Sequence, residues 1–360
     1  MLPRRYHYHR WRVPVEGKPW IVGKVETPLG PIPQVTTRLD VADHLGAIKA
    51  RLGLQRMHYA VDPGLYAIGS PTAESPVFVS ANYKLSFDHL RRELEGIDGW
   101  IMVIDTKGIN VWCAAGKGTF GTDEIVHRIE VTQLYKVVDH RLIIVPQLGA
   151  PGVSAHLVKQ RSSFRVIYGP VRAHDIREFL DAGMETSPAM RQVSFNFGDR
   201  VVLVPMELVQ WSPLAIGFAA VLFVLTGLSQ SGYALSWMAG VREACLLLLA
   251  FIVCGALVPI LLPWLPGRAL SWKGTAIGVA LVVLLIIMGF MPTVQLAGQL
   301  ETVAWVLLMP ALGAFMAMNF TGATTYTSLS GVKREMRFAL PAQIAAAVLG
   351  FALWVAARFF

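Results

Sequence analysis

The pattern of hydrophobic and polar positions changes near Trp211. From about this point onward the chain contains five long runs without a charged side chain, at residues 208–241, 244–267, 274–300, 302–332 and 338–357. Each run reaches the roughly 20 residues that a helix needs to cross a bilayer, and a water-soluble core would not need five of them in succession. We therefore predict about five membrane-spanning helices, near residues 213–229, 244–265, 274–292, 302–320 and 338–357.

The part of the chain before Trp211 alternates short apolar runs with amphipathic stretches. The apolar runs predict strands, at residues 76–81, 99–106, 141–152 and 164–171. The amphipathic stretches predict helices, at residues 84–94, 121–131, 154–160 and 172–183. Repeated strand and helix units form a mostly parallel sheet with a ligand site at the carboxyl ends of its strands. We therefore predict an α/β, Rossmann-like domain over residues 1–212, followed by an all-α transmembrane domain over residues 213–360.

Charge is distributed unevenly along the chain. Residues 1–212 carry 25 Lys and Arg and 21 Asp and Glu, whereas residues 213–360 carry only 7 and 3. Between the predicted spans, basic residues gather in the loops on the side of the amino-terminal domain: Arg268, Lys273, Lys333, Arg334 and Arg337. Because positively charged loops stay in the cytoplasm, we expect a multi-pass protein of the inner (cytoplasmic) membrane with a cytoplasmic amino-terminal domain. These flanking charges also explain the net charge of +8, and no basic stripe indicates nucleic-acid binding.

Few side chains in the apolar half are suited to chemistry. Arg242, Glu243 and Glu301 lie at edges of the uncharged runs, where their side chains could reach the membrane surface, so we expect no buried charge pairs and favour an anchor over a transporter. The chain has three cysteines in all: Cys113, Cys245 and Cys254. Three thiols are too few for an ordinary iron–sulfur cluster or a cysteine-rich zinc module. The two in the second span are expected to act as small apolar side chains.

The remaining cysteine lies in the segment GINVWCAAGKGTFG, residues 108–121, which follows a predicted strand. Asn110 can cap a short helix that runs to about Ala115 and ends at the glycines that follow. Cys113 would then lie in the first turn, at the carboxyl end of the strand. The peptide dipoles at this position favour a thiolate, which is the form that binds soft metals.

Several roles can be considered for this thiol. A Walker-type phosphate loop requires GxxxxGK followed by Ser or Thr, but Val111 replaces the first glycine and Gly118 replaces the hydroxyl residue. A nucleophile requires a base, and His127 and His140 are present without a spacing that argues for pairing. An inert core cysteine and a metal ligand are the other candidates.

The octapeptide NVWCAAGK, residues 110–117, resembles the cap-helix signature of the mercury-methylating corrinoid proteins. More broadly, the domain resembles the cobalt-carrying domain of the corrinoid iron–sulfur proteins of the acetyl-CoA pathway. Further segments are similar to loops of that fold, at residues 62–91, 146–156, 168–176 and 319–336. A cysteine in the octapeptide separates the mercury methylators from the acetyl-CoA pathway carriers. The cluster domain of those carriers is missing here, and so is the corrinoid motif DxHxxG that supplies a histidine to cobalt.

The resemblance implies a role for each residue of the octapeptide. Cys113 would be the catalytic residue and the lower axial ligand of cobalt in a cobalamin-type corrinoid, bound base-off and Cys-on. The other residues would form the helix that presents it: Asn110, Val111, Trp112, Ala114, Ala115, Gly116 and Lys117. The small residues among them would let a flat macrocycle approach the backbone. Asn110 could instead be only a helix cap, Trp112 a core residue and Lys117 a solvated helix end.

Two loops would also contact the corrinoid, at residues 80–84 and 147–152. Their candidate contact residues are Asn82, Tyr83, Gln147, Gly149 and Gly152. The activity implied by the resemblance is corrinoid-dependent methyl transfer to inorganic Hg(II), which forms methylmercury in anaerobic cells. The alternative is a membrane-bound corrinoid methyl carrier for one-carbon metabolism of the acetyl-CoA type, and a transporter with a ligand-sensing domain is a third class. The resemblance further implies a two-cluster 4Fe–4S ferredoxin partner, HgcB, and a methyltetrahydrofolate-linked methyl donor.

Overall fold

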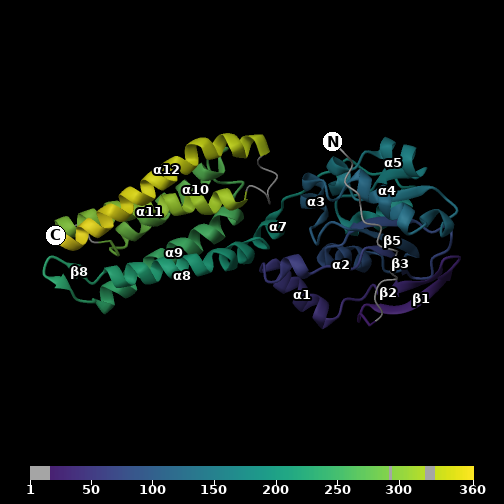
Figure 1. The fold of residues 1–360 in the computed structure, drawn as a ribbon. Helices are drawn as coiled ribbons and strands as arrows, with labels where there is room; N and C mark the ends of the chain where they lie inside the picture. The colour runs from purple at the N-terminus through teal and green to yellow at the C-terminus, as the bar shows by residue number, and fades with distance from the viewer. Residues whose placement is uncertain (1–16, 292–293, 321–328) are drawn as a thin grey trace, which may run out of the picture. The chain divides into compact units, whose positions relative to one another are not determined.

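The computed structural model describes residues 17–291, 294–320 and 329–360 (Figure 1). The chain divides into two units, the first ending at Val193 and the second beginning at Ser194. Residues 194–212, which the charge pattern assigns to the first domain, thus group with the apolar half. Most of the loop at 319–336 that resembles the corrinoid family, residues 321–328, lies outside the described residues.

The first unit is built around one seven-stranded sheet with the order β1-β2-β3-β5-β4-β6-β7. Its strands are β1 (Ile21–Thr27), β2 (Gly30–Val35), β3 (Gly64–Ile68), β4 (Val77–Ala81), β5 (Gly99–Ile104), β6 (Leu142–Val145) and β7 (Arg165–Tyr168). The four strands expected from the sequence are present and run parallel to their neighbours as β5-β4-β6-β7.

The sheet is mostly parallel, as expected, because β2 also pairs parallel with β3, but it is a mixed sheet. Strand β3 runs antiparallel to β5, and β1 and β2 form an antiparallel hairpin at the edge. The apolar pattern does not reveal β1 because its residues alternate between half-buried and exposed and include Lys24 and Glu26. Strand β3 is fully buried but only five residues long, too short for periodicity to distinguish it from a helix turn.

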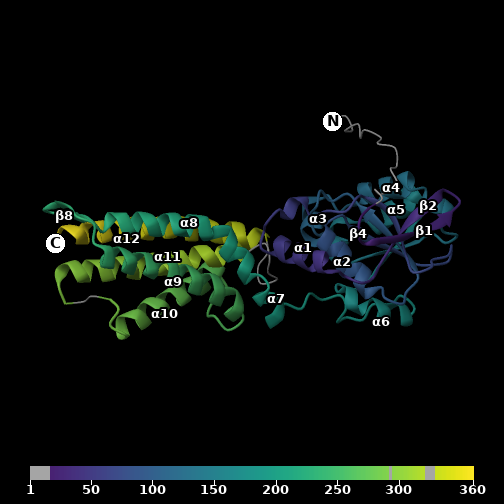
Figure 2. The same cartoon turned by 90° about the horizontal axis from the view of Figure 1, so that it is seen from below.

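Helices cover both faces of the sheet (Figure 2). On one face a buried cluster joins the strands to α3 (Val111–Lys117), α4 (Thr122–Val131) and α5 (Ala155–Ser162). On the other face a second cluster includes side chains of α2 (Lys84–Glu93) and α6 (Ile176–Asp181). Within β5, Met102 joins the first cluster and its neighbours Ile101 and Val103 join the second, as the two-residue period of a strand requires. The α/β class is thereby confirmed.

A buried charge cluster fastens α1 (Val41–Arg51) to α2. Lys84 Nζ lies 2.6 Å from Asp43 Oδ1 and 2.7 Å from Asp88 Oδ1. The Arg91 guanidinium, which is fully buried, contacts the same two carboxylates. Burial by itself would raise the pKa of Asp43, but the hydrogen bonds from Lys84 and from a backbone N–H, together with the two positive charges, lower that pKa below its usual value.

The second unit contains the five long apolar helices that the uncharged runs predict, and each is long and apolar enough to cross a membrane. After the short α7 (Phe197–Val201), they are α8 (Val204–Leu225), α9 (Trp237–Leu261), α10 (Leu270–Ile287), α11 (Leu296–Asn319) and α12 (Leu329–Ala356). Figure 1 shows them side by side as a bundle. Every helix begins earlier than predicted, because its first turns include charged residues that end an uncharged run without ending the backbone hydrogen bonding.

The expectation that the apolar half lacks buried charge pairs is wrong. Glu243 is fully buried and pairs with Arg242 at 2.7 Å, and the same guanidinium also contacts Glu301. Arg358 Nη2 lies 2.6 Å from the other oxygen of Glu301. Two buried indole N–H groups also donate to Glu243, those of Trp305 and Trp354. These residues lie far apart in the sequence, so only the packing of α9, α11 and the chain end brings them together.

Candidate functional site

A cleft of about 500 Å³ opens at the carboxyl ends of the parallel strands. It is lined by residues of β4, of α2 and of the segments that follow β5, β6 and β7: Val79, Ser80, Ser86, His89, Leu90, Arg92, Glu93, Asn110, Val111, Trp112, Pro146, Leu148, Val171, Arg172, Ala173 and His174. The chain passes from β4 to β5 on one side and later to β6 on the other. The cleft therefore lies at a topological switch point, where open α/β sheets bind their ligands.

Helix α3 borders this cleft and carries the thiol of interest. The Asn110 side chain accepts a hydrogen bond from the Cys113 backbone N–H at 2.9 Å, which confirms the predicted cap. The helix begins at Val111, so Cys113 lies in its first turn as expected. It continues to Lys117, beyond the predicted end near Ala115, because Gly118 provides the left-handed residue that ends it, with a φ of 78°.

The two faces of α3 have different roles. Val111, Ala114 and Ala115 face the core, where they are buried. Trp112, which is 40% exposed, the half-buried Cys113 and the exposed Gly116 face outward. Ala114 and Ala115 were expected to let a macrocycle approach the backbone. In the structure their small side chains pack into the core instead. Gly116 alone offers a bare backbone to a ligand, since a Cβ added there would meet nothing within 4 Å.

The loop between β5 and α3 is held by Asn82, at the carboxyl end of the neighbouring strand. Asn82 is only 7% exposed, and its Oδ1 accepts hydrogen bonds from Thr106 N at 3.0 Å, Thr106 Oγ1 at 2.9 Å and Gly108 N at 3.0 Å. Gly108 has a φ of 70°, and a Cβ there would lie 2.9 Å from the Met57 carbonyl oxygen, so glycine is required. Asn82 therefore positions the loop from which α3 starts.

Asp105 reinforces the same loop. Its Oδ1 accepts a hydrogen bond from Lys107 N at 3.0 Å, and its own N–H donates to Glu124 Oε1 at 2.9 Å. Burial by itself would raise the pKa of Asp105, but the hydrogen bonds from Lys107 outweigh this and lower it. The loop is thus held by an ionised carboxylate as well as by an amide.

The structure brings some of the predicted site residues together and separates others. Asn110, Val111 and Trp112 line the cleft, and Leu148 of the predicted loop 147–152 faces them. Other candidates do not line it: Asn82, Tyr83, Gln147, Gly149, Gly152, Cys113, Ala114, Ala115, Gly116 and Lys117. Their contact with a cofactor stays a prediction.

The predicted loop residues have clear structural roles. Tyr83 is buried, and its ring packs edge-on against that of Tyr59. Gln147 begins the 3₁₀ segment Gln147–Gly152. A Cβ on Gly149 would lie 2.4 Å from the Phe120 ring, and one on Gly152 would lie 2.1 Å from the Phe120 carbonyl oxygen. Both glycines therefore allow this segment to pack closely beside α3.

Sequence reasoning missed the basic side of the cleft. His89 and Arg92 come from α2, and Arg172 and His174 come from the segment after β7. The position of α2 in the chain could have indicated these residues, because a helix that follows a central strand begins at the carboxyl edge of the sheet, where ligands bind.

The neighbours of the thiol bear on its possible chemistry. His140, one of the two bases considered for Cys113, contacts the Ser75 carbonyl oxygen through Nε2 at 2.9 Å, and its Nδ1 accepts from Leu142 N at 3.2 Å. Its ring is therefore engaged with backbone elsewhere. Within the described ranges, no group of three or more His, Cys, Asp and Glu side chains could hold a metal ion.

The fold and the site together define an α/β domain with a cleft at its switch point and a capped helix that presents a half-buried thiol. Comparison with known proteins finds similarity over this part of the chain. Residues 54–180, which include the whole cleft and α3, match the family model of the CO dehydrogenase/acetyl-CoA synthase delta subunit.

The chain is also similar to subunits of an archaeal enzyme complex. The chain is 31% identical over 123 residues to the acetyl-CoA decarbonylase/synthase complex subunit gamma of Archaeoglobus fulgidus, and 33% identical over 123 residues to that of Methanopyrus kandleri. Each alignment covers 34% of this chain and 26% of the relative. The chain thus spans about a quarter of the length of these relatives, and the residues that match the family model lie in the first unit.

Proposed function

We propose that the first unit binds a corrinoid and carries a methyl group on its cobalt, as a membrane-bound methyl carrier related to the acetyl-CoA decarbonylase/synthase subunits. The observation that carries this proposal is the similarity over residues 54–180, because that segment contains every residue of the cleft and the whole of α3. A corrinoid, when bound, supplies a cobalt centre that accepts and releases methyl groups.

The described residues fit such a cofactor. The outward face of α3 offers one soft donor, Cys113, between the exposed ring of Trp112 and the bare backbone of Gly116. The cleft beside it combines apolar with polar and basic side chains, which suits a macrocycle with amide groups on its rim. Cys113 would hold the cobalt as a thiolate, and Asn110 would fix the turn that presents it.

Methyl transfer to inorganic Hg(II) is the second candidate, and Cys113 favours it. A thiolate donates more electron density to cobalt than an imidazole does, which favours delivery of a methyl group to an electron-poor, soft acceptor. On this proposal the chain is a mercury-methylating protein of the HgcA type. The support is the octapeptide at residues 110–117, whose cysteine lies on the outward face of a capped helix.

We further infer that the second unit crosses the inner membrane five times and holds the first unit at its cytoplasmic face. The support is the length and apolarity of α8 to α12 and the gathering of basic residues in alternate loops. The buried cluster around Glu243 pairs two carboxylates with two guanidiniums, which suits a closed anchor. With only three cysteines, the chain would receive electrons from the two-cluster ferredoxin HgcB, and methyl groups from a methyltetrahydrofolate-linked enzyme.

The absorption spectrum of the full-length protein, purified without oxygen, tests the corrinoid. A bound corrinoid in near-equal amount to protein is the expected result, and its absence would overturn both candidates. Mercury methylation by anaerobic cells then separates the two candidates. Wild-type protein that binds corrinoid without forming methylmercury would leave only the methyl carrier.

The Cys113→Ala variant tests the thiolate. It should still bind corrinoid but with a shifted spectrum, because cobalt loses its lower ligand, and it should lose mercury methylation. Cys245→Ala, which removes an exposed thiol of the second unit, is the matched control and should behave as the wild type. An unchanged spectrum and retained methylation in Cys113→Ala would refute the ligand role.

A further inference from the structure

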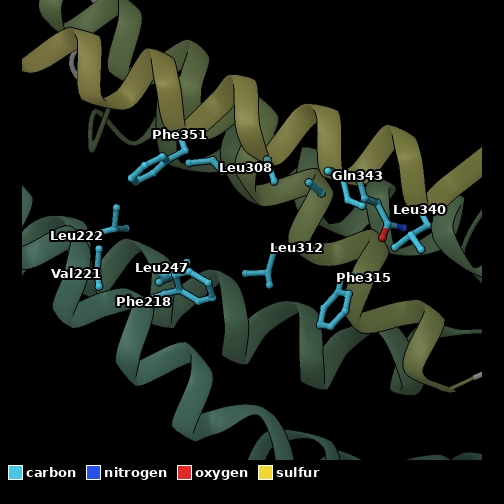
Figure 3. A pocket seen from close by; sticks show the side chains of 13 residues that line it. Phe218, Val221, Leu222, Leu247, Leu308, Leu312, Phe315, Leu340, Gln343 and Phe351 are labelled. Atoms are coloured by element: carbon cyan, nitrogen blue, oxygen red, sulfur yellow. The ribbon is translucent and has the colours of Figure 1, made fainter.

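An apolar groove of about 470 Å³ runs along the helical bundle of the second unit. Its walls come from α8 and α12 and its floor from α9 and α11 (Figure 3). Among the described residues that line it, Gln343 has the one polar side chain, and its Nε2 lies 3.1 Å from Met318 Sδ. Since this amide already has a partner within the protein, the groove suits a hydrocarbon chain better than a polar solute.

One face of α12 forms a wall of this groove. Its lining residues recur every three or four positions, at Leu340, Ile344, Ala347 and Phe351. This spacing places them on one stripe of a helix. All four are exposed, so the groove is open to the surroundings of the bundle.

The same stripe continues into two basic residues. Lys333 and Arg337 precede Leu340 by seven and three positions, which keeps both on the face that lines the groove, and both are exposed. Glu335 lies on the opposite face, where its Oε1 accepts a hydrogen bond from the backbone N–H of Ser271 at 2.6 Å. This contact fixes the rotation of α12 and directs the two cations away from α10.

The dimensions of the groove match one leaflet of a membrane. From Leu340 to Phe351 the helix rises about 16 Å, at about 1.5 Å per residue. Half of a hydrocarbon core is about 15 Å thick. The cations lie just beyond this length, at the end of the bundle that faces the cytoplasm in the proposed orientation, where lipid phosphates lie.

We propose that the groove binds an acyl chain of an anionic phospholipid, whose phosphate is held by Lys333 and Arg337. The inference rests on the proposed membrane insertion of the second unit. The charge pattern selects this occupant, because a second protein chain in the groove would leave the two cations without a counter-charge, whereas a phospholipid supplies a phosphate and a hydrocarbon chain at the required separation.

Native mass spectrometry of the full-length protein in detergent tests the proposal. The protein is titrated with phosphatidylglycerol and with phosphatidylcholine of identical acyl chains, and retained lipids are counted. Phosphatidylglycerol should bind more tightly. The double variant Lys333→Gln, Arg337→Gln should weaken its binding roughly 30-fold, at roughly fivefold for each cation near the lipid surface. Arg268→Gln with Arg334→Gln is the matched control, since it also removes two exposed cations near this end but not from the stripe.

A second pair of variants tests the hydrocarbon part of the site. Ala347→Trp should fill the groove and displace both lipids, whereas Ala345→Trp, at an exposed position about half a turn away, should leave binding unchanged. Equal binding of the two lipids, equal effects of the two charge pairs, or full binding by Ala347→Trp would each overturn the proposal. A dimer that Ala347→Trp dissociates without loss of lipid would assign the groove to a second copy of the chain instead.

The same samples distinguish failure of this site from failure of the proposed function. A protein that needs detergent and carries corrinoid but retains no phospholipid would overturn only the groove. Recovery of the protein from cells without detergent would overturn the membrane insertion and the lipid site together, and would leave the corrinoid site standing.

Discussion

Asn82 is expected to control the position of Cys113 through the loop that precedes α3. Its Oδ1 accepts two backbone hydrogen bonds and one hydroxyl hydrogen bond from the loop before α3, and Thr106 is fully buried there. In Asn82→Ala the two backbone donors lose their acceptor, whereas the Thr106 hydroxyl can still donate to the Ile109 carbonyl oxygen at 2.6 Å. At about 1 kcal/mol for each backbone hydrogen bond, the loop should lose about 2 kcal/mol of local stability. This free energy corresponds to about a 30-fold rise in the population of the open loop.

Amide hydrogen exchange of the full-length protein measures this population directly. Peptides that cover residues 105–118 should exchange about 30-fold faster in Asn82→Ala, whereas peptides from α5 should not change. Asn110→Ala is the matched comparison, because it removes a single hydrogen bond, to the Cys113 N–H. It should accelerate exchange only about fivefold, and only at the start of α3.

The outcome that would refute this reasoning is specific. If Asn82→Ala folds and exchanges in residues 105–118 at the rate of the wild type, the three hydrogen bonds do not hold the loop. An effect no larger than that of Asn110→Ala would likewise show that the cap, and not Asn82, fixes the thiol.

Two further predictions concern packing and charge in the first unit. Gly152→Ala should lower the melting temperature by several degrees, because its Cβ would lie 2.1 Å from the Phe120 carbonyl oxygen; an unchanged melting temperature would contradict the close approach. Asp43→Asn should destabilise the protein by about 3 kcal/mol at pH 7, because it leaves Lys84 and Arg91 with one carboxylate fewer. The folded pKa of Asp43 is lowered, so its contribution is present above the unfolded pKa near 3.8 and is lost as the pH falls through the folded pKa. Denaturant unfolding at several pH values should therefore show the difference from wild type shrinking below about pH 4, and a constant difference would contradict the assignment.

Local features of the site were accessible from the sequence because their causes lie within a few residues. The strand at 99–106, the cap by Asn110, the placement of Cys113 in a first turn and the glycine that ends α3 all depend on short-range geometry. Roles that depend on distant partners could not be predicted in this way. Asn82 was expected only as a cofactor contact, and the sequence did not reveal that its side chain holds a loop 24 to 26 residues further along.

In the apolar half, too, local features could be predicted from the sequence and contacts between distant residues could not. Five uncharged runs are enough to predict five long helices, because the cost of burying charge in a bilayer applies to each segment separately. The predicted helix starts were too late in the sequence. A charged residue ends an apolar run, but the backbone hydrogen bonds of the helix continue through it. The pairing of Arg242, Glu243, Glu301 and Arg358 could not be read from the sequence, because Glu301 is joined to residues 59 positions before it and 57 positions after it.

The sequence by itself thus determined the class of each half, the helices and strands of the parallel sheet, and the helix that carries Cys113, since all of these follow from periodicity and short-range hydrogen bonding. Only the tertiary structure decided that the sheet is mixed, that the cleft combines residues of α2 with loops after three strands, and that α12 aligns two cations with an apolar groove. These features depend on which segments meet in space, and pairing between distant segments leaves no periodic signal along the chain.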